Sequence, residues 1–243
     1  MAVIKDMFTV FSNVFAHVFE SIKTKKEQSR SSRLLNYLTW VILAVSLAYA
    51  GYFAYRWNIA RREKAAQKIF SEAIQLFDQA RTAGEGQDRA AAWTDVEGAF
   101  SLGYEQSSSS KLAPFFQLFQ AHALSELGKH DEAIALTEKA VAGLSEKNKL
   151  FNFYKTKVAL MKLDSKNQVV SDDGLRALQA LAFDAENKNS DLALFYLGSY
   201  YAQKNDDDKA REAWQALIEK QSTNEASKSP FAVLAEETLK SLG

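Results

Sequence analysis

The stretch from Leu34 to Tyr55 constrains the fold of this chain more than any other part of its sequence. It runs for 22 residues without a charged side chain, between Arg33 and Arg56. A helix of that length would be about 33 Å long, close to the hydrocarbon thickness of a bilayer. Buried core helices are usually shorter, and a cleaved signal peptide would start earlier and be followed by small residues. The sequence therefore predicts one transmembrane helix over residues 34–57.

Small side chains recur every four residues along this predicted span, at Ser46, Ala50 and Ala54. Such a stripe lets a second helix approach closely in lipid, where packing drives helix association. Alanine is also common in apolar helices that have no partner. We predict that these three residues contact the transmembrane helix of a partner.

The residues before the span, 1–33, form a predicted amphipathic segment. Phe8, Phe11 and Phe15 belong to a series of apolar residues spaced alternately by four and three, which places them on one face of a helix. An apolar aromatic face next to a membrane span is typical of a helix that lies flat on the bilayer surface. The heptad-like spacing is also compatible with a helix that docks on a protein partner. Both interpretations remain open at the level of sequence.

Composition favours an all-helical domain after the span. Only two prolines and ten glycines interrupt 243 residues, and there is no cysteine, which excludes disulfides and thiolate metal sites. Lys and Arg together number 30, as do Asp and Glu, so the net charge does not indicate a nucleic-acid partner. The 188 residues that follow Tyr55 are enough for one domain with its own core.

One pair of helices near residue 200 has a recognisable spacing. Leu197 and Gly198 are followed by Tyr201, then by Ala210, and then four residues later by Trp214. This is the spacing of the tetratricopeptide repeat, in which the small residues lie where two helices cross and the aromatic residues fill the seams beside the crossing.

A second unit repeats part of this pattern, with Ala121 at the small position, Gly128 in the turn and Ala133 at the close contact. Two further helix pairs are expected. The helix through Phe77 pairs with residues 89–102, and residues 150–163 pair with residues 174–185 across a polar loop at 164–173. A final helix is expected over residues 230–242. The sequence therefore predicts that residues 58–243 form an all-α, tetratricopeptide-like solenoid of about four degenerate helix pairs with a capping helix.

Taken together, one membrane helix, degenerate tetratricopeptide units and a final helix resemble the ancillary subunit family of the bacterial SecYEG translocon. The resemblance implies an inner-membrane protein with its N-terminus in the cytoplasm and its repeats outside. It also implies association with the translocon and with a membrane-anchored periplasmic chaperone. Charge does not set the orientation, because the twenty residues on each side of the span hold five basic side chains. The phenylalanine-rich start of the chain departs from the family's pattern.

No arrangement of residues in the sequence points to catalysis. The three histidines are scattered and no cysteine accompanies them, so no nucleophile or zinc constellation can be recognised. The acidic run at residues 206–208 falls where a turn between helices belongs, and capping explains it better than calcium binding. We therefore expect a non-enzymatic protein without cofactor, metal or small-molecule substrate.

The expected partners are the bilayer and other membrane or envelope proteins. The inward-facing positions of two predicted first helices are apolar or neutral, which suits unfolded or helical segments better than charged tails. These positions are Phe115, Leu118 and His122 in one helix and Leu192, Phe195 and Ser199 in the other. Two other functions remain open: a structural subunit of a large envelope or motor complex, and a receptor that faces the cytoplasm.

Overall fold

The computed structural model describes residues 16, 31–83, 87–222 and 229–241, and this part of the chain is all-helical, as predicted. The predicted amphipathic segment, with Phe8, Phe11 and Phe15, lies outside the described residues. The helices of the described part are α2 (Ser31–Thr82), α3 (Gln87–Ser107), α4 (Ala113–Glu126), α5 (His130–Ala142), α6 (Phe151–Leu163), α7 (Gln168–Phe183), α8 (Ser190–Gln203), α9 (Asp207–Ser222) and α10 (Pro230–Ser241).

Helix α2 continues well past the apolar stretch. It is a single helix of 52 residues that joins the predicted span to the predicted helix through Phe77 and ends at Thr82. The Thr82 hydroxyl donates to the carbonyl oxygens of Asp78 and Gln79, at 3.2 and 3.0 Å. The chain divides into two compact units, Met1–Arg61 and Arg62–Gly243, and the boundary falls within this helix.

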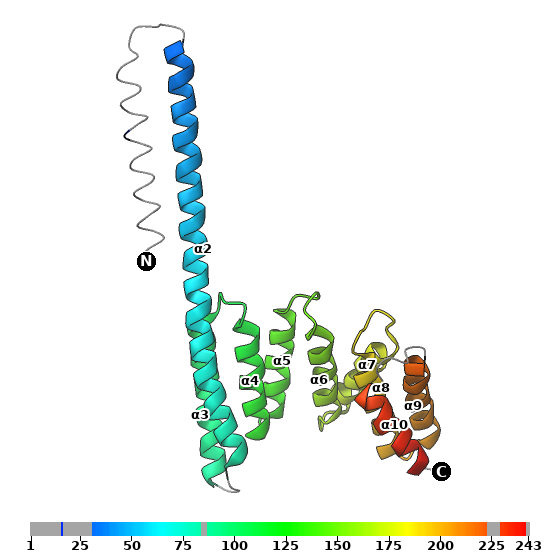
Figure 1. Ribbon diagram of the computed structural model, residues 1–243. Helices are drawn as coiled ribbons and strands as arrows, with labels where there is room; N and C mark the ends of the chain where they lie inside the picture. The colour runs from blue at the N-terminus through cyan, green and yellow to red at the C-terminus, as the bar shows by residue number, and fades with distance from the viewer. Residues whose placement is uncertain (1–15, 17–30, 84–86, 223–228, 242–243) are drawn as a thin grey trace. The chain divides into compact units, whose positions relative to one another are not determined.

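In the second unit, consecutive helices lie against one another and bury three apolar clusters (Figure 1). The first cluster joins the end of α2 to α3 and α4, and its largest fully buried side chains are Trp93, Phe100 and Phe116. The second is small and lies where α4 and α5 meet α6. The third extends from α6 to α10 and contains Trp214 and Leu217.

Aromatic rings dominate the first cluster. The Phe70 ring meets the rings of Phe100, Phe116 and Phe119 edge-on, with centroids 5.8, 5.1 and 5.4 Å away. Edge-to-face pairs of this kind stabilise a core beyond the area that they bury. The end of α2 is therefore held to α3 and α4 by aromatic packing.

Close helix crossings depend on residues without a Cβ. A Cβ added at Gly198 would lie 2.5 to 2.7 Å from three atoms of the Trp214 ring, which confirms the tight crossing predicted for this pair. A Cβ at Gly174 would lie 2.8 Å from the Ala159 carbonyl oxygen of α6. Both glycines are buried, so α6 approaches α7, and α8 approaches α9, more closely than a larger residue would allow.

The prediction for the start of α7 was wrong. The helix begins at Gln168 rather than at Gly174, so the polar loop predicted over residues 164–173 shrinks to residues 164–167. Asn167 caps the helix, because its side-chain oxygen accepts from the Val169 N–H at 3.0 Å. Gly174 therefore marks a crossing inside the helix rather than a helix start.

The turn between α4 and α5 is repeated 77 residues later between α8 and α9. Gly128 and Asn205 occupy this turn with positive φ values of 76° and 59°. In the first turn the Lys129 N–H donates to the Leu124 carbonyl oxygen, and in the second the Asp206 N–H donates to Tyr201, each at 2.9 Å. Glycine and asparagine are the residues that tolerate this left-handed conformation best, which explains why they stand at equivalent positions.

A second recurring feature precedes α4, α6, α8 and α10, and Asn167 makes the same kind of contact before α7. The side-chain oxygen of one polar residue accepts from the backbone N–H two residues later, at 2.9 to 3.3 Å, just before α4, α6, α8 and α10. These residues are Ser110, Asn148, Asn187 and Ser229, which lie 38, 39 and 42 residues apart. The described part of the second unit is therefore built from units of about that length.

Candidate interaction surfaces

The three residues predicted on α4 differ in exposure. Leu118 is buried in the small cluster between α4, α5 and α6. Phe115 is half-buried beside the Tyr154 ring of α6, with centroids 6.3 Å apart, and burial raises the pKa of Tyr154. Leu118 therefore serves the contact between helices, while part of Phe115 stays accessible at the edge of that contact.

His122 is half-buried among aromatic and charged side chains. Its ring lies 5.1 Å from Phe77 and 5.7 Å from Trp93, centroid to centroid. Its Nε2 is 3.9 Å from a carboxylate oxygen of Glu126, and Arg89 holds the other oxygen of that carboxylate at 2.9 Å. Burial lowers the pKa of His122, and the positive charge of Lys157 lowers it further, while Glu126 opposes both. The neutral imidazole is therefore the favoured form in the folded chain.

The residues predicted on α8 are tied into the end of the array. Leu192 is buried, and the Phe195 ring lies 5.7 Å from the Phe231 ring of α10. The Phe195 carbonyl oxygen accepts from Trp214 Nε1 at 3.1 Å and from the Ser199 hydroxyl at 2.9 Å. Phe115 and Leu118 of α4 pack in one apolar cluster and Phe195 of α8 in another, so the two sets are not brought together in one site.

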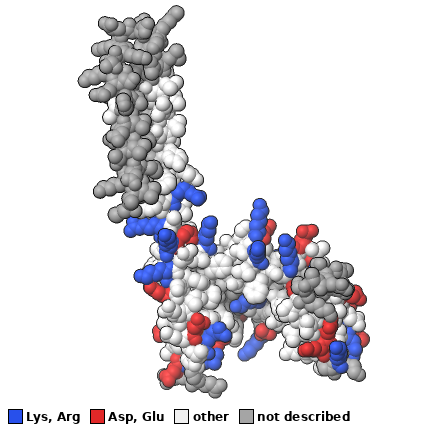
Figure 2. Space-filling model, viewed as in Figure 1, with Lys and Arg blue, Asp and Glu red and all other residues white. Residues whose placement is uncertain are grey.

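The small residues of the predicted span lie on the surface of α2. Ala50 and Ala54 are exposed and Ser46 is half-buried. In the described part of the chain, α2 contains the one helix segment that is long and apolar enough to cross a membrane. None of the most apolar part of this segment is buried. Between Arg33 and Arg56 the sequence of α2 has no charged residue, and the part of this stretch that is visible in Figure 2 has neither a blue nor a red side chain. A helix without charge and without a protein cover needs an apolar environment.

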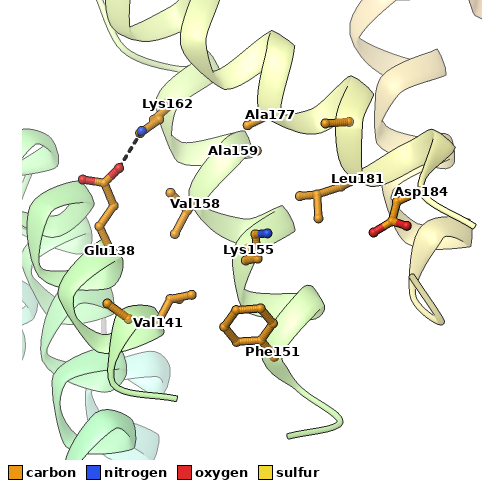
Figure 3. Close-up of a pocket in the computed structure, with 12 residues that line it drawn as sticks. Glu138, Val141, Phe151, Lys155, Val158, Ala159, Lys162, Ala177, Leu181 and Asp184 are labelled. Carbon is orange, nitrogen blue, oxygen red and sulfur yellow. Dashed lines mark ion pairs between the residues drawn. The ribbon is translucent and has the colours of Figure 1, made fainter. Parts of the chain in front are cut away.

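A pocket between α5, α6 and α7 is a feature that the sequence did not predict. It has a volume of about 420 Å³ and opens to solvent between α5 and α7, with α6 beneath it (Figure 3). Its walls are mainly apolar and include Val141 from α5, Phe151, Val158 and Ala159 from α6, and Ala177 and Leu181 from α7.

Lys162 closes one end of this pocket by joining three helices. Its ammonium group lies 2.5 Å from a Glu138 oxygen of α5 and 2.8 Å from an Asp173 oxygen of α7. The hydrogen bond to Asp173, followed by that to Glu138, raises the pKa of Lys162, and the same contact lowers the pKa of Asp173. The side chain of Lys162 is only 17% exposed, and its positive charge is neutralised within the protein by these two carboxylates.

The sequence held part of the signal for this pocket. Phe151, Lys155, Val158 and Lys162 recur at helical spacing and share one face of α6, a pattern that indicates a helix face against other elements. The sequence does not show how far apart the two covering helices stand. That separation depends on packing between helices distant in the chain.

The described residues contain no group of three His, Asp or Glu side chains that could hold a metal ion. The acidic turn acts as a cap instead: one Asp206 side-chain oxygen accepts from the Lys209 N–H at 3.3 Å and the other from the Lys209 ammonium at 2.7 Å. This contact lowers the pKa of Asp206 and raises that of Lys209.

Comparison with known proteins found no match among family models, curated proteins or solved structures. The resemblance to the translocon-associated family therefore rests on the sequence features alone.

Proposed function

We propose that this chain is a membrane-anchored, non-enzymatic protein-interaction module whose second unit is a tetratricopeptide-like array. One observation carries this proposal: an exposed, charge-free stretch of α2 continues without a break into a helix that packs on the first of several stacked helix pairs. Such an arrangement tethers a protein-binding surface to a bilayer and needs no reactive group.

The tetratricopeptide-like assignment is supported by recurrence. Equivalent turns at Gly128 and Asn205, and polar openings every 38 to 42 residues, indicate one supersecondary unit used repeatedly. The Gly198–Trp214 crossing has the residue types of the repeat at the expected spacing. Helix α10 packs on α8 and α9 and places the Phe231 ring against Phe195, as a capping helix would.

For location and partner, the proposal follows the resemblance. The N-terminus lies in the cytoplasm, α2 crosses the inner membrane, and the repeats lie outside. They bind a membrane protein complex such as the Sec translocon, or its chaperones. The surface of α2 at Ser46, Ala50 and Ala54 contacts a partner's transmembrane helix, and the partly exposed Phe115 and Phe195 face other envelope proteins.

The orientation is tested with single cysteines at Ser12 and Ser108, because the native chain has no cysteine. Ser108 is exposed in the turn after α3. A membrane-impermeant thiol reagent applied to intact cells with a permeabilised outer layer should label the Ser108→Cys chain and leave the Ser12→Cys chain unlabelled. The opposite pattern would contradict the orientation and favour a receptor that faces the cytoplasm.

The partner is sought by co-purification in mild detergent and mass spectrometry. Ser46→Leu and Ala50→Leu should reduce recovery of the partner, because bulky residues separate the two helices. Val41→Trp, an exposed change on the opposite face of the same helix, is the matched control. Unchanged recovery with all three variants would move the contact to another part of the chain.

A further inference from the structure

An exposed aromatic side chain stands beside the pocket between α5, α6 and α7. Phe183 is 61% exposed, although it lies at the end of a helix whose other face is buried. It follows Ala180 by three residues and precedes Asp184, and both of these residues line the pocket. Side chains three residues apart are neighbours on a helix surface, so Phe183 forms a protrusion on the pocket's rim.

The pocket is large enough for an aromatic ring. Its volume is about 420 Å³, whereas an apolar protein cavity of roughly 150 Å³ accommodates benzene. Its apolar walls on α5, α6 and α7 suit such a ring chemically. Phe183 is exposed and is not among the residues that line the pocket, so its own ring does not occupy this space.

The rim carries one positively and one negatively charged side chain. Lys155 of α6 lies over the Phe151 ring at 5.4 Å, and Asp184 of α7 accepts a backbone N–H from Glu186 at 2.9 Å. Neither forms an ion pair with another described residue, in contrast to Lys162, which is held by two carboxylates. Lys155 and Asp184 stand on different walls of the pocket (Figure 3).

We propose that a second copy of this chain occupies this surface. The two copies are related by a twofold axis, and each inserts Phe183 into the pocket of the other while Lys155 of one copy faces Asp184 of its partner. A twofold contact requires one patch that is complementary to itself. This patch holds a protrusion, a matching hollow and two opposite charges, which is what such a contact needs. The inference goes beyond the proposed function, because it concerns self-association rather than binding of another protein.

Self-association is measured with the full chain, in two differently tagged forms that are purified separately in mild detergent and then mixed. The wild-type forms should co-purify and sediment as a dimer that dissociates on dilution. Phe183→Ala should weaken the dimer by about 30-fold or more, because it empties a central aromatic contact on both sides of the axis. Val169→Ala is the matched control: Val169 is 74% exposed on the same helix but does not line the pocket, and its substitution should have no effect.

The charges test the twofold arrangement directly. Lys155→Glu or Asp184→Lys alone places like charges opposite each other at two points and should weaken the homodimer about tenfold. A mixture of the two single variants should form a heterodimer of nearly wild-type strength, because each altered residue then faces an opposite charge. A wild-type chain that stays monomeric at about 100 µM would overturn the proposal. So would a dimer that Phe183→Ala leaves intact, or single variants that do not recover on mixing.

Discussion

Helix pairs α4–α5 and α8–α9 share a backbone design and fill it with different side chains. Their first helices begin at Ala113 and Ser190, 77 residues apart, and both are 14 residues long. The turns that follow have a positive-φ residue at the same position and the same backbone hydrogen bonds. The two pairs can therefore be compared position by position.

The two pairs differ in the side chains at the helix crossing. Gly198 lies against the Trp214 ring in the second pair, and the equivalent residues in the first pair are Ala121 and Thr137. Trp214 is almost fully buried and donates to the Phe195 carbonyl oxygen. Thr137 is also buried, but it donates to Ala133 of its own helix at 2.7 Å.

In the first pair, side chains of α6 complete the packing at the helix crossing. Met161 of α6 places its sulfur 3.7 Å from the Thr137 hydroxyl, and Lys162 of α6 binds Glu138 of α5. The second pair fills its own crossing with Trp214. The same backbone can thus be stabilised by its own side chains or by those of the next unit, and the two arrangements should respond differently to substitution.

The largest effect is expected from Trp214→Thr, which gives the second pair the side chain of the first. No methionine stands ready to fill the space, so the substitution leaves a cavity and should destabilise the full chain by about 3 kcal/mol. Thermal unfolding in mild detergent, followed by helical circular dichroism, measures this loss. A change below about 1 kcal/mol would show that the crossing relaxes around the smaller residue.

The next largest effect concerns how the size of residue 198 depends on the size of residue 214 across the helix crossing. Gly198→Ala should cost about 1–3 kcal/mol in the wild-type chain, because its Cβ meets the Trp214 ring. In the Trp214→Thr chain the same substitution should cost nothing or stabilise the helix slightly. Gly98→Ala is the control, since a Cβ at Gly98 has no neighbour within 4 Å. Equal costs in both backgrounds would mean that the two residues are not coupled.

A smaller, localised effect is expected where the first pair depends on α6. Lys162→Met removes the ion pairs to Glu138 and Asp173 and should cost about 1 kcal/mol, because the carboxylates are half-exposed and can be solvated. Hydrogen exchange should accelerate in α5 and remain unchanged in α9. Uniform acceleration would indicate that the two pairs unfold as one unit.

The smallest effect should appear with pH. His122 has its pKa lowered from 6.5 in the folded chain, so its contribution to stability is fully present above that value and is lost as the pH falls below it. The loss should stay below about 1 kcal/mol, since a third of the side chain is exposed. The equivalent residue of the second pair is Ser199, which does not titrate. His122→Gln should therefore flatten the decline in melting temperature between about pH 7 and 5 relative to the wild type. Identical pH profiles would contradict this account.

The features predicted correctly from sequence were those that depend on short-range pattern. The all-α class and the close approach of Gly198 to Trp214 follow from period and spacing. The start of α7 was wrong because Gly174 was interpreted as a helix start, whereas it serves a crossing with α6. In the sequence, a glycine at a helix start cannot be told from a glycine at a helix crossing. Only the position of the neighbouring helix distinguishes the two.

Surfaces were harder to predict than elements. Leu118 and Leu192 were predicted to lie on an inward-facing surface that a partner contacts, whereas both side chains are buried. The pocket beside Phe183 was not predicted, because it depends on the distance between α5 and α7. Partner, orientation and location stay predictions until the experiments above are done.

The polar turns before α4, α6, α8 and α10 also bear on how a chain like this can grow. Because the backbone passes through Ser110 and Asn187 with the same hydrogen bonds, a copy of residues 110–186 inserted before Asn187 would enter and leave each helix along the existing path. Only the seam between the copied α4 and the end of α7 would need new side chains, since α4 now meets α3 through Phe116 beside Gly103. Duplication of a gene segment could thus lengthen the array by two helix pairs at once while every turn is conserved.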